Sequence, residues 1–275
     1  MKTLPVAIQL YSVRNDLSEN FEAALRKVKE IGYDGVEFAG LYNIGPAKIR
    51  DLCKELDLVP ISAHVPIFEM MGDTEALMSA YETIGVKYIA IPFMPEDRRV
   101  GAERWEETVK EIHRISEIAK KHGITLLYHN HDFEFKKIDG ENALDILYKT
   151  IPADVLKTEI DTCWANVGGE NPADYVRKYT GRAPVVHLKD FIMAGKKPTN
   201  MYELIGVKTV GDTAAEEDFA FRPIGYGVQD MPSILEASID AGAEWVVVEQ
   251  DRPSLDKTPM ECAQMSREFL KKLGW

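Results

Sequence analysis

Four of the six histidines end short apolar runs of the kind that forms buried β-strands. They are His64, His129, His131 and His187. Carboxylates end or follow other such runs, among them Asp161 and Glu249. Polar groups that end apolar strands cost free energy unless they are paired or bind something. Imidazole and carboxylate ligands together suit Zn, Mn, Co, Fe or Mg, and the histidines favour a transition metal.

Side chains two residues apart in a strand share one of its faces. The pairs that this rule joins are His129 with His131, Glu159 with Asp161, and His187 with Lys189. On the same alternation Glu249 faces the interior of the fold if Val247 does. Four strands therefore offer imidazole, carboxylate, imidazole and carboxylate in turn, a set that could hold a metal ion.

Each residue alone also has a structural explanation. A single histidine at a strand end is more often a hydrogen-bonded structural group, and Asp161, Glu249 or Lys189 could form a salt bridge at a rim. Packing alone does not readily explain ligand-type residues at the ends of four separate strands. The convergence therefore favours a metal site.

A recurring pattern supplies the elements that would position these residues. An amphipathic stretch ends in a glycine, the usual left-handed helix cap, and a β-rich run follows. The glycines are Gly32, Gly85, Gly123 and Gly242. In all, eight strand-like runs occur, at residues 6–10, 34–38, 59–64, 87–91, 124–129, 155–161, 185–189 and 245–249. Helices are expected at 18–31, 46–56, 76–84, 101–122, 142–149, 172–179 and 232–241.

Eight strands alternating with helices predict an α/β protein with a single (β/α)8 TIM barrel that spans residues 1–275 as one domain. An open doubly wound sheet is the alternative, but no G-x-G-x-x-G follows the first strand. A barrel carries its active site at the C-terminal ends of its strands. The long stretch 191–226 is expected to be an irregular loop over that end, with solvated acids at 214–218.

Composition and charge limit the classes of partner and the cellular location that we expect. The formal charge is −12, which disfavours a nucleic-acid partner. Three cysteines make a disulfide framework improbable, and the first residues show no secretory signal. No apolar run approaches the ~20 residues that a membrane span needs. We expect a cytoplasmic protein without a membrane partner; its oligomeric state is not encoded in any readable feature.

At these motifs the sequence resembles the xylose isomerase-like TIM-barrel family of sugar phosphate isomerases and epimerases. The matching segments are IQLYSVR at 8–14, GVE at 35–37, YHNHDFEF at 128–135, EID at 159–161, HLKD at 187–190 and EQD at 249–251. The resemblance implies a metal held by a carboxylate on strand five, an aspartate on strand six, a histidine on strand seven and a glutamate on strand eight.

Asp161, His187 and Glu249 match the last three of these ligands, whereas the strand-five position is His129, with His131 and Glu134 as alternatives. In the ketose epimerases that strand-five glutamate is also one of two proton-transferring bases. Its replacement counts against simple two-base epimerisation. Trp164 stands where those epimerases often carry a substrate-binding histidine, which is a second departure.

These features predict a divalent-metal-dependent isomerase or epimerase of a sugar, keto-sugar or polyol that acts through an enediolate. The candidate acids and bases are Glu134, Glu249 and Lys189, and the candidate substrate-binding residues are Gln9, Glu37, His64, His131 and Trp164. One alternative is a metal-dependent lyase or dehydratase of a keto-sugar, keto-inositol or oxidised glycoside. Others are a non-catalytic sugar-binding barrel and, less favoured because of the acidic charge, a relative of the apurinic endonucleases.

Overall fold

Eight parallel strands close into a barrel in the computed structural model, which describes residues 3–194 and 219–275. Around the barrel the order is β1, β12, β9, β8, β5, β4, β3 and β2. Their bounds are β1 Val6–Gln9, β2 Gly35–Ala39, β3 Val59–His64, β4 Tyr88–Ile91, β5 Thr125–His129, β8 Lys157–Asp161, β9 Val185–Leu188 and β12 Trp245–Val248. The predicted (β/α)8 barrel is confirmed, and the assignment of residues 1–275 to one domain stays a prediction.

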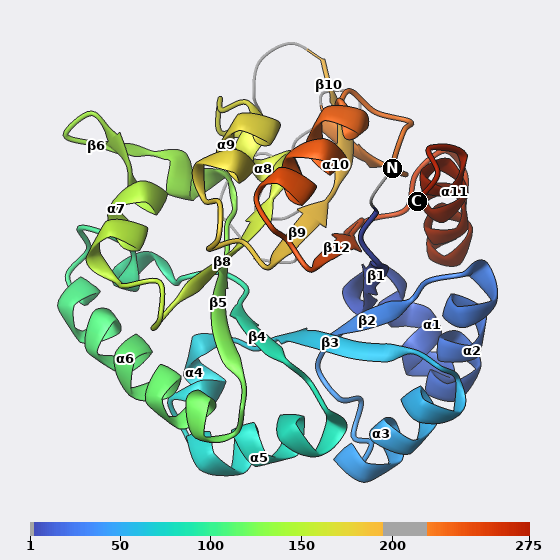
Figure 1. Ribbon diagram of the computed structural model, residues 1–275, viewed down its shortest axis with the longest axis horizontal. Coiled ribbons are helices and arrows are strands. Elements are labelled where there is room, and N and C mark those ends of the chain that lie inside the picture. Colours follow the sequence, from blue (N-terminus) through green and yellow to red (C-terminus); the bar gives the residue numbers. More distant parts are fainter. Residues whose placement is uncertain (1–2, 195–218) are drawn as a thin grey trace.

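A ring of helices surrounds the barrel (Figure 1). The main ones are α2 Phe21–Ile31, α3 Pro46–Glu55, α5 Thr74–Ile84, α6 Trp105–Lys121, α7 Ala143–Thr150, α9 Pro172–Lys178, α10 Met231–Asp240 and α11 Pro259–Lys272. Shorter helices are α1 Arg14–Glu19, α4 Ile67–Met70 and α8 Thr162–Val167. All four predicted glycine caps adopt positive φ, from 70° at Gly123 to 102° at Gly32. They let each helix turn directly into the next strand.

Three local expectations need correction. The helix expected at 18–31 is split into α1 and α2, because Asn20 is extended and its side chain accepts the Ala23 N–H as a new cap. Helix α11 was not predicted, although Thr258 and Glu261 form the capping box at its start. The ends of the stretch 191–226 are not irregular but pair as an antiparallel hairpin, β10 Asp190–Met193 with β11 Phe219–Arg222. The acids at 214–218 lie outside the described residues.

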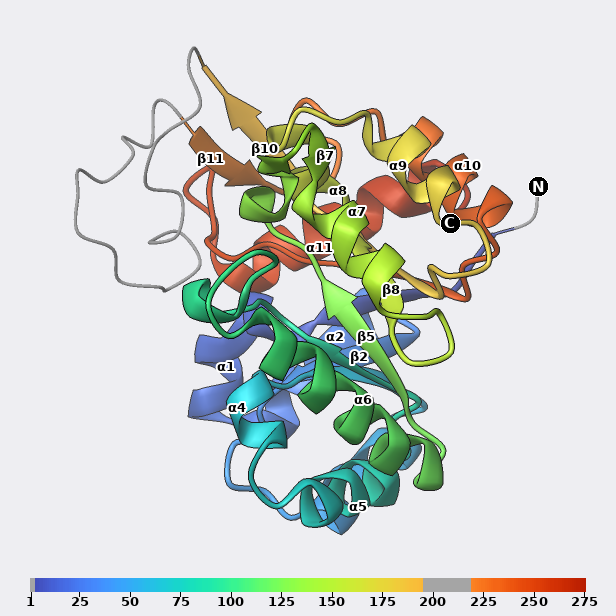
Figure 2. The same ribbon diagram turned by 90° about the vertical axis from the view of Figure 1, so that its left-hand side faces the viewer.

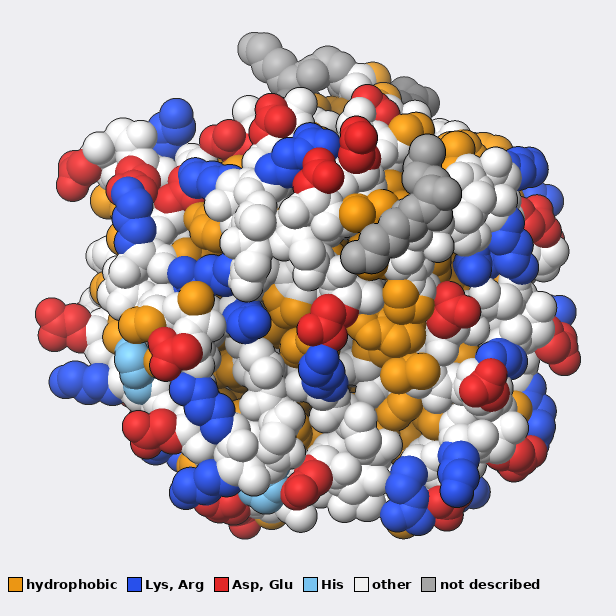
Figure 3. Space-filling model, viewed as in Figure 1, with side chains coloured by type: hydrophobic (Ala, Val, Ile, Leu, Met, Phe, Trp, Pro, Cys, Tyr) orange, Lys and Arg blue, Asp and Glu red, His pale blue; other side chains and the backbone are white. Residues whose placement is uncertain are grey.

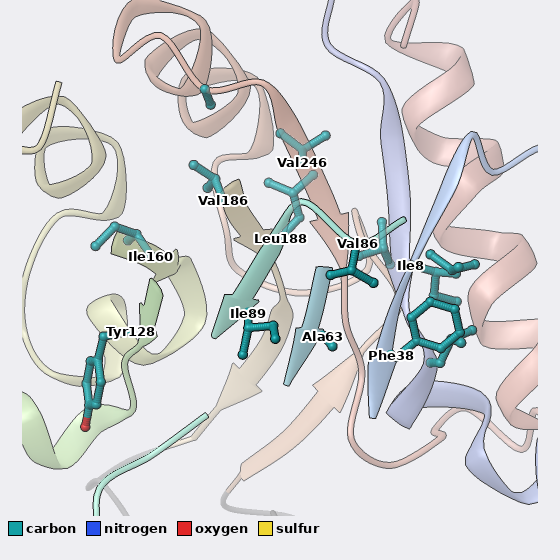
Figure 4. Packing of buried hydrophobic residues seen from close by; sticks show 14 of the residues in the cluster. Ile8, Phe38, Ala63, Val86, Ile89, Tyr128, Ile160, Val186, Leu188 and Val246 are labelled. Carbon is teal, nitrogen blue, oxygen red and sulfur yellow. The ribbon is translucent and has the colours of Figure 1, made fainter. Parts of the chain in front are cut away.

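The strands separate two apolar layers. Side chains that point outward from the strands pack against the helices, and Figure 4 shows members such as Ile8, Phe38, Tyr128 and Val246. A smaller group of apolar side chains fills the barrel, namely Ala7, Ile61, Tyr88, Ala90, Leu127, Val185 and Val247. Because Leu127, Val185 and Val247 face inward, the period-2 rule turns His129, His187 and Glu249 inward as well. The apolar interior thus ends in a charged layer.

The hairpin β10–β11 projects from the barrel end opposite to the chain termini (Figure 2). In Figure 3, which shares the view of Figure 1, apolar side chains gather near the middle of the visible face and side chains of both charge signs surround them. Helices of the described residues include none long and apolar enough to cross a membrane. All three cysteines are buried and free, and a cytoplasmic location stays a prediction.

Close packing at the start of β2 gives a first test. A Cβ built on Gly35 would meet the Val59 carbonyl oxygen at 2.7 Å and the Trp245 ring at 3.0 Å. We expect Gly35→Ala to lower the free energy of unfolding by about 1–3 kcal/mol, because backbone would have to shift. Urea unfolding measures the change. Gly72→Ala is the control, since its Cβ makes only an ordinary contact, and it should stay within about 0.5 kcal/mol. Equal stabilities of the two variants would contradict the packing argument.

Candidate metal centre

A cavity of about 340 Å³ opens where the barrel strands end. Its wall contains the aromatic and apolar residues Tyr11, Ala39, Gly40, Pro66, Pro92 and Phe93. Its ionisable residues are His64, Glu69, His129, His131, Lys189, Glu249 and Asp251. The volume suits a small-molecule site, since such sites commonly fill about 300–1,000 Å³.

Four ligand-type atoms lie together at the floor of this cavity. They belong to His129, Asp161, His187 and Glu249, and all lie within 4.8 Å of one another. His129 Nε2 is 3.4 Å from Asp161 Oδ2 and 3.8 Å from Glu249 Oε2, and His187 Nδ1 is 3.2 Å from Glu249 Oε2. The structure thus brings together the four residues that the sequence proposed as metal ligands. We call them the ligand cluster.

Hydrogen bonds outside the ligand cluster orient two of its members. The Nδ1 atom of His129 is 3.2 Å from the Pro92 carbonyl oxygen. Since a carbonyl only accepts, that nitrogen carries the proton and Nε2 keeps its lone pair. Asp161 accepts the backbone N–H of Trp164 through Oδ1 at 2.9 Å and so caps α8. Both His129 Nε2 and Asp161 Oδ2 are left buried without a hydrogen-bond partner.

Buried unpartnered polar atoms are rare and call for an explanation. A divalent cation at this point supplies one, because two imidazoles and two carboxylates form a suitable mixed donor set. The fit of the residues to a metal therefore rests on these two atoms as well as on the clustering.

Lys189 lies beside the ligand cluster and is 1% exposed. Its Nζ is 2.7 Å from Asp251 Oδ2, 2.9 Å from Glu249 Oε2 and 3.6 Å from Asp161 Oδ2. Burial alone would lower the pKa of Lys189, but the three carboxylates outweigh it and raise that pKa well above its usual value. Burial likewise opposes ionisation of Glu249, yet Lys189 and His187 hold the Glu249 pKa well below the ordinary range. Burial raises the pKa of Asp251 to about 6.

A second group of side chains lies behind His187, on the side away from Glu249. His187 Nε2 is 2.7 Å from Glu37 Oε1, and His64 Nε2 is 2.6 Å from Glu159 Oε2. Gln9 donates to Glu37 Oε1 at 2.7 Å, and the Ser62 hydroxyl donates to its Oε2. Of the predicted substrate-binding residues, Gln9 and Glu37 are thus buried in this group, whereas His64 and His131 line the cavity.

Two further predicted site residues, Glu134 and Trp164, belong neither to the cavity lining nor to the two groups described above. Glu134 accepts the Tyr128 hydroxyl at 2.5 Å and the His131 backbone N–H at 2.8 Å, so it closes the 3-10 turn Asp132–Phe135. Trp164 is fully buried in a cluster with Phe219 and Phe221. Glu134 thus closes a turn and Trp164 packs beside Lys189, and the acid–base role of the one and the substrate-binding role of the other stay predictions.

Comparison with known proteins identifies the family. The family model described as xylose isomerase-like TIM barrel matches residues 25–273. The chain belongs to this family. The predicted resemblance is therefore confirmed.

Curated relatives of the chain are named as enzymes. The inosose dehydratase of Geobacillus kaustophilus is 22% identical over 277 residues, which are 92% of this chain and 87% of that protein. A second inosose dehydratase, from Bacillus cereus, is 26% identical and covers 92% of this chain and 89% of its own length. The expectation that the protein is an enzyme is therefore confirmed.

Solved structures confirm the fold. A sugar phosphate isomerase/epimerase from Parabacteroides distasonis superposes with a TM-score of 0.78 at 20% identity, over 98% of each chain. The IOLI protein, solved with a bound zinc atom, superposes with a TM-score of 0.73 at 17% identity, again over 98% of each chain.

Three residues of the site were not among the sequence candidates. Glu159 contacts His64; strand alternation placed it on one face with Asp161, but no role was assigned to it. Asp251 belongs to the EQD segment at 249–251, which carried no role for it, and it binds Lys189. Tyr11 forms part of the cavity wall, and no sequence signal distinguished it.

The pH dependence of stability tests whether the Glu134 carboxyl is protonated in the folded chain. Burial raises its pKa to about 8, whereas an unfolded glutamate titrates near ~4.3. The folded chain holds the proton more tightly, so the Glu134 contribution to the unfolding free energy falls as pH rises from about 4.3 to about 8. Glu134→Gln has no proton to lose. We expect the variant to gain stability relative to the parent across this window, by up to about 3 kcal/mol.

Urea unfolding at about pH 5 and about pH 8 measures this difference. Glu106→Gln on the exposed face of α6 is the control and should show no such trend. A stability difference between parent and Glu134→Gln that stays constant with pH would show that Glu134 is ionised in the folded chain.

Proposed function

We propose that the protein is a divalent-metal-dependent lyase that eliminates a β-substituent, water in the simplest case, from a polyhydroxy ketone such as a keto-sugar, a keto-inositol or an oxidised glycoside. The observation that carries the proposal is the 2.9 Å contact between Lys189 Nζ and Glu249 Oε2 inside the cavity. It sets a proton acceptor and a proton donor side by side. An elimination needs both.

The ligand cluster would hold the metal through His129, Asp161, His187 and Glu249. When bound, the metal would polarise the substrate carbonyl and stabilise negative charge after loss of a proton from the neighbouring carbon. The identity of the metal stays open among Mn, Co, Zn, Fe and Mg.

Glu249 is assigned as the base. Its contacts with His129, His187 and Lys189 all fall on Oε2, so we assign proton transfer to Oε1. Its low pKa keeps it ionised, and the carboxylate takes the proton from the carbon next to the carbonyl. The electron pair of that C–H bond becomes the carbon–carbon double bond of an enolate.

Lys189 is assigned as the donor to the leaving oxygen. The enolate electrons form the new double bond, the bond to the β-oxygen breaks, and Lys189 supplies the proton that makes the leaving group neutral. Glu249 loses its negative charge on taking the substrate proton, so the attraction that holds the Lys189 proton weakens at the same time. A proton then passes from the Glu249 carboxyl, whose Oε2 lies 2.9 Å from Lys189 Nζ, to the lysine, and both groups are reset.

An elimination fits the strand-five residue better than two-base epimerisation does. A second base on the opposite face of the carbon would need a carboxylate where the chain has His129. The isomerase or epimerase function expected from the sequence remains the second candidate, favoured by the likeness to the Parabacteroides distasonis protein. It shares the first proton-removal step, so product analysis separates the two.

The test uses purified protein loaded with Mn²⁺, Co²⁺ or Zn²⁺ and a panel of keto-sugars, keto-inositols and oxidised glycosides in D₂O. We expect solvent deuterium at the carbon next to the carbonyl and loss of water or of an aglycone, seen by NMR and mass spectrometry. Glu249→Gln should reduce both by about 10²–10⁴-fold. Lys189→Met should retain exchange but lose elimination. Lys120→Met, on the exposed face of α6, is the control and should behave as the parent.

Two other outcomes would support a different function. An isomeric product without loss of a group would support the isomerase or epimerase. Substrate binding without deuterium exchange in any metal form would overturn both and support a non-catalytic sugar-binding barrel.

A further inference from the structure

We propose that the protein binds a second divalent metal ion, held by Glu37, His64, Glu159 and the Nε2 atom of His187. We call these four residues the inner cluster. The site lies deeper in the barrel than the ligand cluster and shares only His187 with it. The proposed elimination does not require it.

The donor atoms of the inner cluster lie within 4.8 Å of one another. His64 Nε2 is 2.6 Å from Glu159 Oε2 and 3.2 Å from Glu37 Oε1. His187 Nε2 is 2.7 Å from Glu37 Oε1 and 3.6 Å from Glu159 Oε2. Ligands about 2.0–2.2 Å from a tetrahedral ion are separated by roughly 3.3–3.5 Å. Shifts of under about 1 Å would therefore convert these contacts into a coordination shell.

An unpartnered buried atom marks the inner cluster independently of these contacts. Glu159 is fully buried, and its Oε1 has no hydrogen-bond partner. Glu37, by contrast, is held from behind by Gln9 and Ser62, which both donate to it. Such outer donors orient a carboxylate ligand and are typical of metal sites.

Charge points in the same direction. Among the described residues, five buried carboxylates meet at the cavity floor: Glu37, Glu159, Asp161, Glu249 and Asp251. The buried lysine among them is Lys189, so four negative charges stay uncompensated when all five carboxylates are ionised and the histidines are neutral. One divalent ion balances half of that charge, and with two ions and His187 as a bridging anion one negative charge remains. Uncompensated charge in a protein interior carries a large desolvation cost.

The inner cluster can be reached from the cavity. His64 lines the cavity and its side chain is 11% exposed. Its ring stacks on that of His187, with centroids 5.2 Å apart and an interplanar angle of 7°. An ion that enters past His64 would meet Glu159 and Glu37 directly behind it.

His187 would bridge the two ions. Its Nδ1 faces the ligand cluster and its Nε2 faces the inner cluster, so each ion binds a different nitrogen. The ring must then be doubly deprotonated, and any proton shared by Glu37 and Glu159 must leave as well. Binding of the second ion thus exchanges protons for metal charge, and no oxidation or reduction takes place.

The test is a metal count on the chelator-treated full chain with Co²⁺ alone, by equilibrium dialysis and elemental analysis without substrate. We expect two ions for each parent chain. Glu159→Gln and His64→Gln should each bind one, and Asp161→Asn should also bind one, because it damages only the ligand cluster. Glu106→Gln is the control and should bind two. Circular dichroism checks that each variant is folded, and two inner-cluster variants guard against a misfolded one.

A parent chain that saturates with one ion, or folded Glu159→Gln and His64→Gln proteins that still bind two, would overturn the inference. The inner cluster would then be a hydrogen-bonded support for His187. Because the count needs no turnover, a two-ion protein that eliminates nothing would overturn the proposed function and leave this inference in place.

Discussion

The concentration of negative charge at the end of the barrel constrains the rest of the site. Alternating strand side chains place carboxylates from β2, β8 and the end of β12 around one point, away from bulk water. Carboxylates in such a medium must be protonated, paired with a cation or bound to a metal. The perturbed pKa values follow from this: Glu37 lies below its usual range because His64 and His187 outweigh burial, and Glu159 lies well above it because of burial and the Glu37 charge.

The fold meets this constraint with side chains whose two polar atoms have different roles. Asp161 uses one oxygen to cap α8 and leaves the other for the ligand cluster. His129 fixes one nitrogen on the Pro92 carbonyl and leaves the other free. His187 divides its two nitrogens between Glu249 and Glu37. In each case one contact fixes the geometry, so the second atom is oriented before any ligand arrives.

The sequence predicts much of this site because parallel strands obey simple rules. Alternation placed His129, Asp161, His187 and Glu249 on inward faces, and the glycine caps located the turns between helices and strands. It could not predict pairings that depend on distant loops. Nothing near Asp251 in the chain indicates that it binds Lys189, and Glu134 looks like a free carboxylate until the 3-10 turn folds it onto Tyr128. The sequence pattern missed helix α11 because no strand follows it, and its own signal is the capping box at its start.

The additions to the basic barrel can be understood as supports for Lys189. Its ammonium faces carboxylates on one side, while its Nζ lies 5.3 Å from the Trp164 ring of α8 and 5.2 Å from the Phe221 ring of β11. Aromatic faces attract a cation without offering it a proton acceptor.

Next along the chain, Asp190 accepts the backbone N–H groups of Phe191, Gly225, Gly227 and Gln229, which ties β10 to the segment after β11. Gln229 in turn donates to the Lys189 carbonyl oxygen at 3.3 Å. The hairpin therefore fixes the lysine from its backbone as well as from its side chain, which favours proton transfer to a single position in the cavity.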